Sequence, residues 1–327
     1  MTRTSTMSHR RLLAAFAVLP FALAACSDQK PAVSSTTSSG PTVVPTSMTT
    51  ESNASTPSSS PIRVVSYSDA ESAYNEGRFG EATEMFESYV AIKPENPWGH
   101  YMLGLSAWKS GDLVRAEAAF DRSLQLDSTQ VKSYLNSARV LLDLGRNHEA
   151  LDRARAALTL DASSVDARRL IARAFHGLGQ IDSAIQGYRE ALIVDDRDVW
   201  AMNNLGVLYL DQGQPEAALL PLARAAQLKS TSPVFQNNLG IALERTGHIV
   251  AARKSFEAAV AADSTYSKAA VSLARVNALE VDSTDVTSLD DIAEEFRIQL
   301  GMWKDSARVP VVDSVVVPTQ ADTVQKQ

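Results

Sequence analysis

The chain has 327 residues, of which 45% are hydrophobic and 21% are charged, and its formal net charge at pH 7 is −7. This acidic balance argues against a role in binding nucleic acid, because the phosphate backbone requires a basic surface. Cys26 is the single cysteine, so the chain can form neither an internal disulfide nor a metal site with several thiolates.

The N-terminal segment has the pattern of an export signal. A start containing three arginines is followed by an apolar stretch from Leu12 to Ala22 and then by Leu23-Ala24-Ala25-Cys26. The apolar stretch is too short for a transmembrane anchor, because a helix that spans a bilayer needs about 20 residues. We therefore predict a signal peptide over residues 1–25.

The tetrad that ends at Cys26 resembles a bacterial lipobox. The resemblance implies that Cys26 becomes the lipidated first residue and that the protein is held at a membrane on its periplasmic side. Ser27, standing where an aspartate would favour the inner membrane, points to the outer membrane, although this sorting rule does not hold in every bacterium. Residues 26–62 are rich in Ser, Thr and Pro, which predicts a disordered tether.

One glycine recurs six times at a constant interval, without insertion or deletion. An alanine stands five residues after each glycine, and a small residue stands seven residues before it. A bulky residue follows most of these alanines by four positions, as Phe120 follows Ala116, with Ala154 as the exception. The pattern predicts two antiparallel helices per unit, the first of them ended by the glycine. The glycines are Gly77, Gly111, Gly145, Gly179, Gly213 and Gly247.

This unit resembles the tetratricopeptide repeat, whose period of about 34 residues it shares. The resemblance implies an all-α fold over residues 63–280, a right-handed superhelical solenoid of about six and a half helix pairs. Asp69 stands where later repeats carry Leu or Ile, which suits a terminal repeat that faces solvent. Pro221 lies inside the second helix of the fifth repeat and is expected to bend it.

Residues 281–305 are predicted to form a C-terminal capping helix that starts at Ser288 and covers the last exposed apolar edge of the solenoid. A partner-binding helix is the alternative. Residues 306–327 are predicted to be a disordered tail, although the run from Val309 to Val317 could instead add as a strand to a partner's sheet. The apolar face of the helix comprises Leu289, Ile292, Phe296, Leu300 and Trp303.

The sequence contains no pattern typical of a catalytic or cofactor site. Four histidines fall at different positions of the repeats, without the close spacing of metal ligands. Glycine motifs that bind phosphates or dinucleotides are not found at any strand-to-helix junction. We therefore expect a protein that is not an enzyme and that uses no metal, cofactor or small-molecule substrate. The histidines are His100, His148, His176 and His248.

The family resemblance places ligand contacts at the second, fifth, sixth and ninth positions of each first helix, on the concave face. In the third and fourth repeats these positions are mostly basic, and Asp166 contributes one opposing negative charge. This half of the groove is therefore expected to be cationic. In the fifth and sixth repeats they are rich in asparagine, whose amide can pair with both groups of an extended backbone. The candidate peptide-binding residues are Lys132, Asn136, Arg139, Arg169, Arg173, Trp200, Asn203, Asn204, Asn237 and Asn238.

These features favour a membrane-anchored adaptor whose concave groove binds a peptide or helical segment of another cell-envelope protein. Under this hypothesis, replacing Asn204 and Asn238 by alanine should weaken partner capture and leave thermal melting unchanged. A structural alternative is a self-associating scaffold or assembly factor that uses its convex face or its end helix. A plainer interpretation also stays open, in which the arginines are solvated and the asparagines are common features of such repeats.

Overall fold

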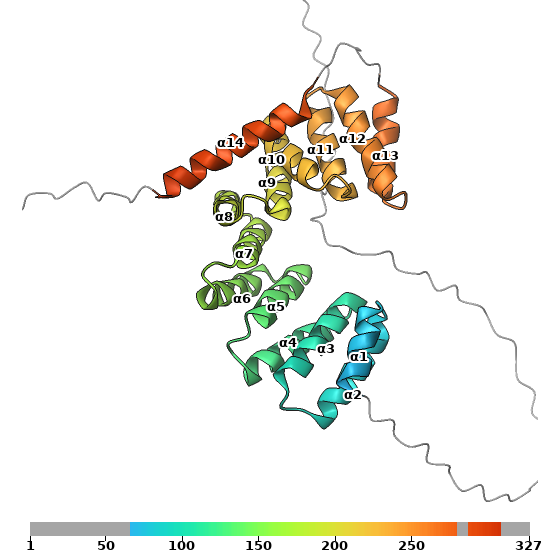
Figure 1. The fold of residues 1–327 in the computed structure, drawn as a ribbon, viewed down its shortest axis with the longest axis vertical. Helices are drawn as coiled ribbons and strands as arrows, with labels where there is room; N and C mark the ends of the chain where they lie inside the picture. The colour runs from blue at the N-terminus through green and yellow to red at the C-terminus, as the bar shows by residue number, and fades with distance from the viewer. Residues whose placement is uncertain (1–65, 280–286, 309–327) are drawn as a thin grey trace, which may run out of the picture. The chain divides into compact units, whose positions relative to one another are not determined.

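The computed structural model describes residues 66–279 and 287–308, and this part of the chain consists of helices and turns (Figure 1). It contains fourteen α-helices and no strand. Six consecutive pairs run from α1 to α12 and are followed by α13 and α14. The helices are α1 (Tyr67–Asn75), α2 (Phe79–Ile92), α3 (Pro97–Ser110), α4 (Leu113–Leu126), α5 (Val131–Asp143), α6 (Asn147–Leu160), α7 (Val165–Gly177), α8 (Ile181–Val194), α9 (Val199–Asp211), α10 (Pro215–Leu228), α11 (Pro233–Arg245), α12 (Ile249–Ala262), α13 (Ser267–Asn277) and α14 (Leu289–Arg308).

From α1 to α13, each helix packs against the helices that precede and follow it in the chain. This serial packing is that of a helical solenoid, so the expected fold class is confirmed. The predicted signal peptide, tether and valine-rich segment lie outside the described residues. Of the helices that are described, none combines the length and the apolar character needed to cross a bilayer.

Gly111 shows how a first helix ends. Its φ is 91°, a value that residues with a side chain rarely adopt. The resulting turn lets the amide of Asp112 donate to the carbonyl oxygen of Ala107 at 2.9 Å. The same left-handed conformation occurs, as predicted, at all six glycines of the repeat, with φ between 68° and 91°: Gly77, Gly111, Gly145, Gly179, Gly213 and Gly247.

The two helices of a pair approach most closely where a small residue faces a large one. A Cβ atom added at Gly240 would lie 2.5 Å from Cε1 of Phe256, whose ring is fully buried. In the third repeat, where the bulky residue is replaced by Ala154, the small position is occupied by Ala138, and both are buried in one cluster. This repeat therefore has two small residues at the contact. Gly104 with Phe120 and Gly206 with Leu222 repeat the tight arrangement.

Pro221 is buried within α10, which nevertheless runs as one helix from Pro215 to Leu228. Proline has no amide hydrogen to donate to the carbonyl of Ala217, so one bond of this helix is missing. The interruption expected at Pro221 is therefore local and does not end the helix.

The C-terminal helix α14 begins at the predicted cap, where the amide of Asp291 donates to Oγ of Ser288 at 3.2 Å. It continues to Arg308, so residues 306–308 are helical rather than part of the tail. It packs on α10 and α8 instead of covering α13, the edge that the sequence suggested (Figure 1). Val271 of α13 accordingly remains 66% exposed.

The tight contact at Gly240 generates a stability prediction. Gly240→Ala should destabilise the protein by about 1–3 kcal/mol, because the buried Phe256 ring has no room to move away. The measurement is the free energy of unfolding from urea denaturation followed by circular dichroism. Gly301→Ala is the matched control, because its added methyl group meets nothing within 4 Å. Replacing an exposed glycine within a helix by alanine should raise the free energy of unfolding by about 0.5–1 kcal/mol. Equal stability of the two variants would contradict the close packing.

Candidate functional site

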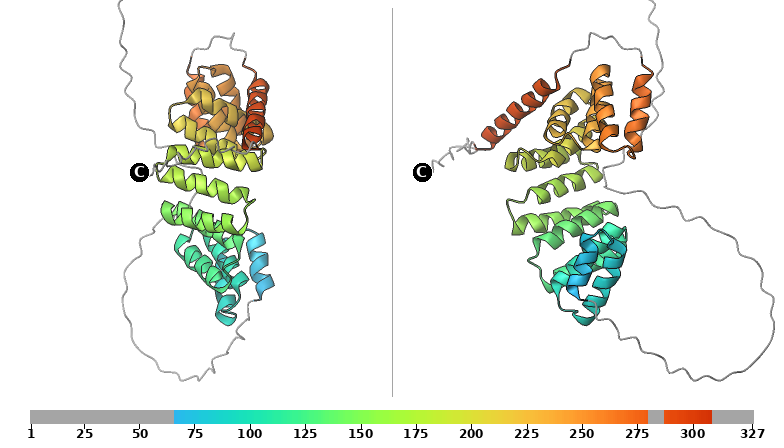
Figure 2. Two further views of the ribbon diagram at one scale, coloured as in Figure 1. Left: turned by 90° about the vertical axis from the view of Figure 1, so that its left-hand side faces the viewer. Right: turned by 45° about the vertical axis from the view of Figure 1, so that its right-hand side comes forward.

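The first helices of the pairs form a continuous inner face. The helices are stacked in succession (Figure 2). Close backbone contacts between first helices join α1 with α3, α3 with α5, α5 with α7, α9 with α11 and α11 with α13. The second helices from α2 to α12 approach one another less closely, and side-chain ion pairs such as Arg153 with Asp121 link some of them. The first helices therefore lie on the more closely packed side of the stack. All the candidate peptide-binding residues belong to α5, α7, α9 and α11.

Asparagine side chains tie neighbouring first helices together. Nδ2 of Asn238 donates to Oδ1 of Asn203 at 2.9 Å, and Nδ2 of Asn136 donates to the hydroxyl of Tyr101 at 3.1 Å. In each pair the donor is at the sixth position of one repeat and the acceptor at the fifth position of the repeat before it. Only the pair Asn203 and Asn238 joins two amides of neighbouring repeats, and we call this pair the amide ladder.

Most of the predicted asparagine sites are buried by this packing. Asn203 and Asn237 are 0% and 3% exposed, and Asn136 and Asn238 are also buried. These four side chains lie between helices rather than on the open surface. The expectation that Asn238 can be removed without affecting melting assumed an exposed side chain. In the structure its loss would leave Oδ1 of buried Asn203 without this donor, so we now predict a lower melting temperature.

Asn204 differs from the other asparagines because it remains partly exposed. It hydrogen-bonds to the hydroxyl of Tyr188, the bulky buried residue of α8. Burial raises the pKa of the Tyr188 hydroxyl above its ordinary value, so the group stays protonated. The side-chain amide of Asn204 is thus oriented by its hydrogen bond and remains partly accessible to solvent.

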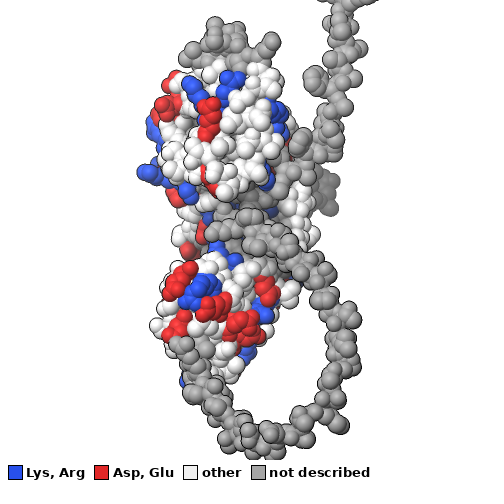
Figure 3. Space-filling view, turned by 90° about the vertical axis from the view of Figure 1, so that its right-hand side faces the viewer, with Lys and Arg blue, Asp and Glu red and all other residues white. Residues whose placement is uncertain are grey.

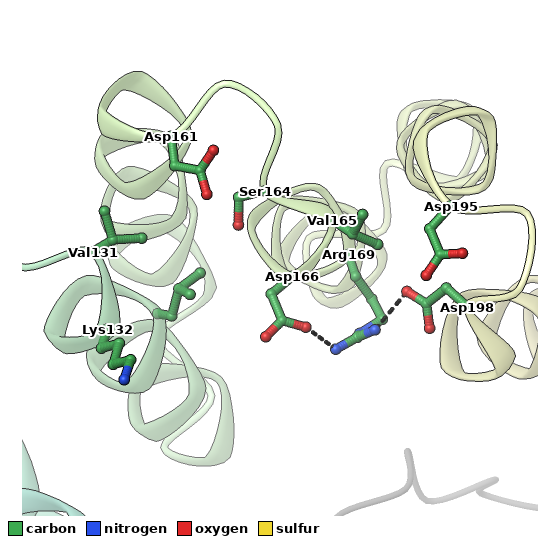
Figure 4. Close-up of a pocket in the computed structure, with 10 residues that line it drawn as sticks. Val131, Lys132, Asp161, Ser164, Val165, Asp166, Arg169, Asp195 and Asp198 are labelled. Carbon is green, nitrogen blue, oxygen red and sulfur yellow. Dashed lines mark hydrogen bonds and ion pairs between the residues drawn. The ribbon is translucent and has the colours of Figure 1, made fainter.

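The predicted arginines are paired with carboxylates. Arg139 lies 2.8 Å from Asp166, and Arg173 lies 3.8 Å from Asp143. Arg169 bridges Asp166 and Asp198 (Figure 4). Three positive charges face three negative ones, so this section is close to neutral and the expected cationic half of the groove is not formed. On the face drawn in Figure 3, acidic and basic side chains are likewise intermingled.

Asp198 was missed as a groove residue because it precedes the helix. Its Oδ1 accepts hydrogen bonds from the amides of Trp200 and Ala201 and caps α9, while its Oδ2 accepts from Arg169 at 2.5 Å. An aspartate directly before a predicted helix is a recognisable capping signal, but the sequence does not show that its second oxygen reaches α7.

An open cavity of about 550 Å³ lies at the beginnings of α5 and α7 and beside the turn before α9. Its lining is mixed, with apolar, acidic and basic side chains. Figure 4 shows Arg169 between the carboxylates of Asp166 and Asp198, with Lys132 on the neighbouring helix. Lys132, Asp166 and Arg169 were expected in the groove and the remaining lining residues were not. The lining residues are Val131, Lys132, Leu135, Asp161, Ser164, Val165, Asp166, Arg169, Asp195 and Asp198.

Trp200 is held at the edge of the inner face by aromatic and cationic contacts. Its ring packs edge-on against Phe235 at a centroid distance of 4.9 Å, and Nζ of Lys229 lies 5.4 Å from its centroid. The side chain is partly buried. A rigid, partly exposed aromatic ring next to Asn204 offers apolar and hydrogen-bonding groups in one place.

The junction between α7 and α9 differs from the other neighbouring first helices because the two do not pack closely. Two polar contacts cross it: the ion pair of Arg169 with Asp198, and the approach of His176 Nε2 to Asp211 at 3.5 Å. Burial raises the pKa of Asp211, against the opposing effects of His176 and Arg245. Polar contacts therefore hold this junction on the inner face.

The available groups of the inner face are amides, carboxylates, guanidinium groups and aromatic rings, which hydrogen-bond, form ion pairs and stack. Among residues 66–279 and 287–308, no three His, Cys, Asp or Glu side chains converge as metal ligands would.

Comparison with known proteins agrees with this architecture. Models of the tetratricopeptide repeat match residues 67–131, 172–213 and 199–229. A solved tetratricopeptide-repeat protein of Thermus thermophilus has a TM-score of 0.50 and 18% identity, with 56% of this chain and 100% of that chain covered. A structure of the APC/C hetero-tetramer Cut9–Hcn1 has a TM-score of 0.55 and 15% identity, with 63% and 41% covered. At such identities these structures support the fold alone. No curated protein matches the sequence significantly.

The amide ladder predicts the effect of removing one of its members. Asn238→Ala should lower the free energy of unfolding by about 1–3 kcal/mol, because Oδ1 of Asn203 would stay buried without its donor. Asn75→Ala, at the exposed end of α1, should change it by less than about 0.5 kcal/mol. Urea denaturation of both variants measures the difference. An Asn238→Ala protein as stable as the control would show that the ladder is not structural.

Proposed function

The chain carries tetratricopeptide repeats, and on this premise we propose that it is a membrane-anchored adaptor that binds a segment of another cell-envelope protein along its inner face. Proteins of this repeat class act as scaffolds for protein–protein interaction, and stacked repeats offer extended concave surfaces to their partners. The proposal concerns the anchor, the site and the class of partner.

The observation that carries the proposal is the cavity beside Arg169 together with Trp200 and Asn204 on the same series of first helices. These groups combine apolar surface, an oriented amide and paired charges within a few helical turns. An extended peptide presents the same mixture of backbone amides and side chains. Because Asn203, Asn237 and Asn238 are buried, the accessible part of the proposed site is smaller than the sequence pattern suggested.

Support for the anchor comes from the sequence alone. The pattern around Cys26 resembles a lipobox, and residues 26–62 have the composition of a flexible tether. A lipid on Cys26 would hold the solenoid at a membrane while the tether lets it move away from the surface. We propose the periplasmic side of the outer membrane as its location.

Site-specific photocrosslinking in the native envelope tests the binding site. A photoreactive residue replaces Val207 on α9 or Ile241 on α11, which lie at the ninth position of their repeats, and gel analysis with mass spectrometry identifies the products. We expect a discrete product with the same envelope protein from both positions. Arg155 and Lys254, exposed on α6 and α12, serve as control positions on second helices. Equal products from all four positions, or none from the inner two, would reject the assignment.

A second experiment tests the anchor. Cells that express the wild-type protein should incorporate labelled palmitate into it, because Cys26 is the single cysteine and would carry the lipid. Cys26→Ser should abolish the label and move the protein from the membrane to the soluble fraction, whereas Ser27→Ala should retain both label and membrane association. An unlabelled wild-type protein would refute the lipid anchor.

A further inference from the structure

Helix α14 crosses from the fifth repeat to the fourth on the side of the second helices. Its buried residues Ala293, Phe296 and Leu300 belong to the same core cluster as α10, and α14 contacts both α10 and α8 (Figure 1). The helix therefore bridges two repeats that are otherwise joined by the packing of α8 on α9 and by contacts on the inner face.

The outer face of α10 is specialised for this contact. Leu219 and Ala223 are only 7% and 2% exposed, and the corresponding positions of α4 carry Glu117 and Asp121. The position of Leu219 is also apolar in α6 and α8, but the position of Ala223 is charged in every other second helix from α2 to α12, namely as Glu87, Asp121, Arg155, Arg189 and Glu257. The docking position of α14 is thus built into α10 and is not a general property of the repeats.

Polar contacts fix α14 at both of its ends. Near its beginning, Nε2 of Gln227 on α10 donates to Oδ1 of Asp290 at 2.9 Å. Near its end, Trp303 lies under the guanidinium group of Arg189 on α8, at 4.8 Å from the ring centroid. Nζ of Lys304 donates to Oδ2 of Asp196, in the connection between α8 and α9, at 2.7 Å. The attachment therefore spans the junction of the two repeats.

This junction is the place where the first helices α7 and α9 do not pack closely. The cavity lies across it, because Val165 and Arg169 belong to α7 while Asp195 and Asp198 lie in the segment that leads into α9. Any change in the angle between the fourth and fifth repeats therefore changes the width of the cavity.

We propose that α14 is a strap that fixes the angle between the fourth and fifth repeats and thereby sets the opening of the cavity on the opposite face. The apolar contacts with α10 hold the strap, and its contacts with Arg189 and Asp196 transmit the restraint to α8. On the inner face α7 and α9 make few close backbone contacts, so the angle at this junction is restrained there mainly by side chains, including the ion pair of Arg169 with Asp198. The link to partner binding rests on the proposed function, whereas the mechanical role does not.

The test uses a variant that loosens only the far end of the strap. The double variant Trp303→Ala/Lys304→Ala removes the contacts with Arg189 of α8 and with Asp196. It also removes the edge-on contact of Trp303 with Phe296, but keeps the side chains of Phe296 and Leu300 themselves. The matched control is Ile298→Ala/Met302→Ala, which truncates two side chains of the same helix that are exposed. Circular dichroism verifies that both variants fold.

Pulsed electron paramagnetic resonance between spin labels measures the angle. Labels at Ala162→Cys and Thr231→Cys, both in exposed connections, span the junction, and labels at Thr231→Cys and Ser264→Cys lie on its C-terminal side. All proteins carry Cys26→Ser, so that only the introduced cysteines react. We expect the strap variant to broaden or shift the distance distribution of the first pair and to leave that of the second pair unchanged. The control variant should leave both unchanged.

An unaltered distribution for the first pair in the strap variant would overturn the proposal, and so would an equal change in the control variant. Photocrosslinking from Val207 separates this result from the proposed function. If crosslinking persists while the distances do not change, the strap is refuted and the binding site stands. If the strap variant changes the distances of the first pair, but the protein with the photoreactive residue at position 207 and an intact strap gives no crosslink, the strap stands and the binding site is refuted.

Discussion

The ring of Phe256 leaves no room for even a methyl group at Gly240, and this constraint on how closely paired helices approach recurs along the chain. Because one partner is small wherever the other is large, the two helices of a pair can pack closely. The third repeat, with Ala138 and Ala154, has two small residues at this contact. The inner face is then built from the further contacts between successive first helices.

Close packing of the first helices changes what their polar residues do. Asn136 and Asn238 each donate a hydrogen bond to the first helix of the preceding repeat. Arg139 and Arg169 are paired with Asp166. Buried polar groups need hydrogen-bond partners. On a closely packed face, many polar side chains therefore bond to one another and are not available to a ligand. What remains accessible is concentrated at the cavity and around Trp200 and Asn204.

The junction between the fourth and fifth repeats joins the two sides of the molecule. Inside, it is crossed by Arg169 with Asp198 and by His176 with Asp211. Outside, α14 spans α10 and α8. A solenoid normally has only contacts between neighbours, so a helix that returns to brace an earlier pair adds a restraint that the repeats alone do not provide.

The sequence by itself determined the repeat period, the glycine turns and the cap at Ser288, because each of these depends on particular residue types at fixed spacings along the chain. It also contained a signal for the docking of α14, because Ala223 stands where every other second helix from α2 to α12 has a charged residue. Only the tertiary structure decided which asparagines are buried, which carboxylates neutralise the arginines and where α14 lies. These depend on groups from different helices, such as Asn238 and Asn203, and their distance is set by the packing of whole helices rather than by local spacing.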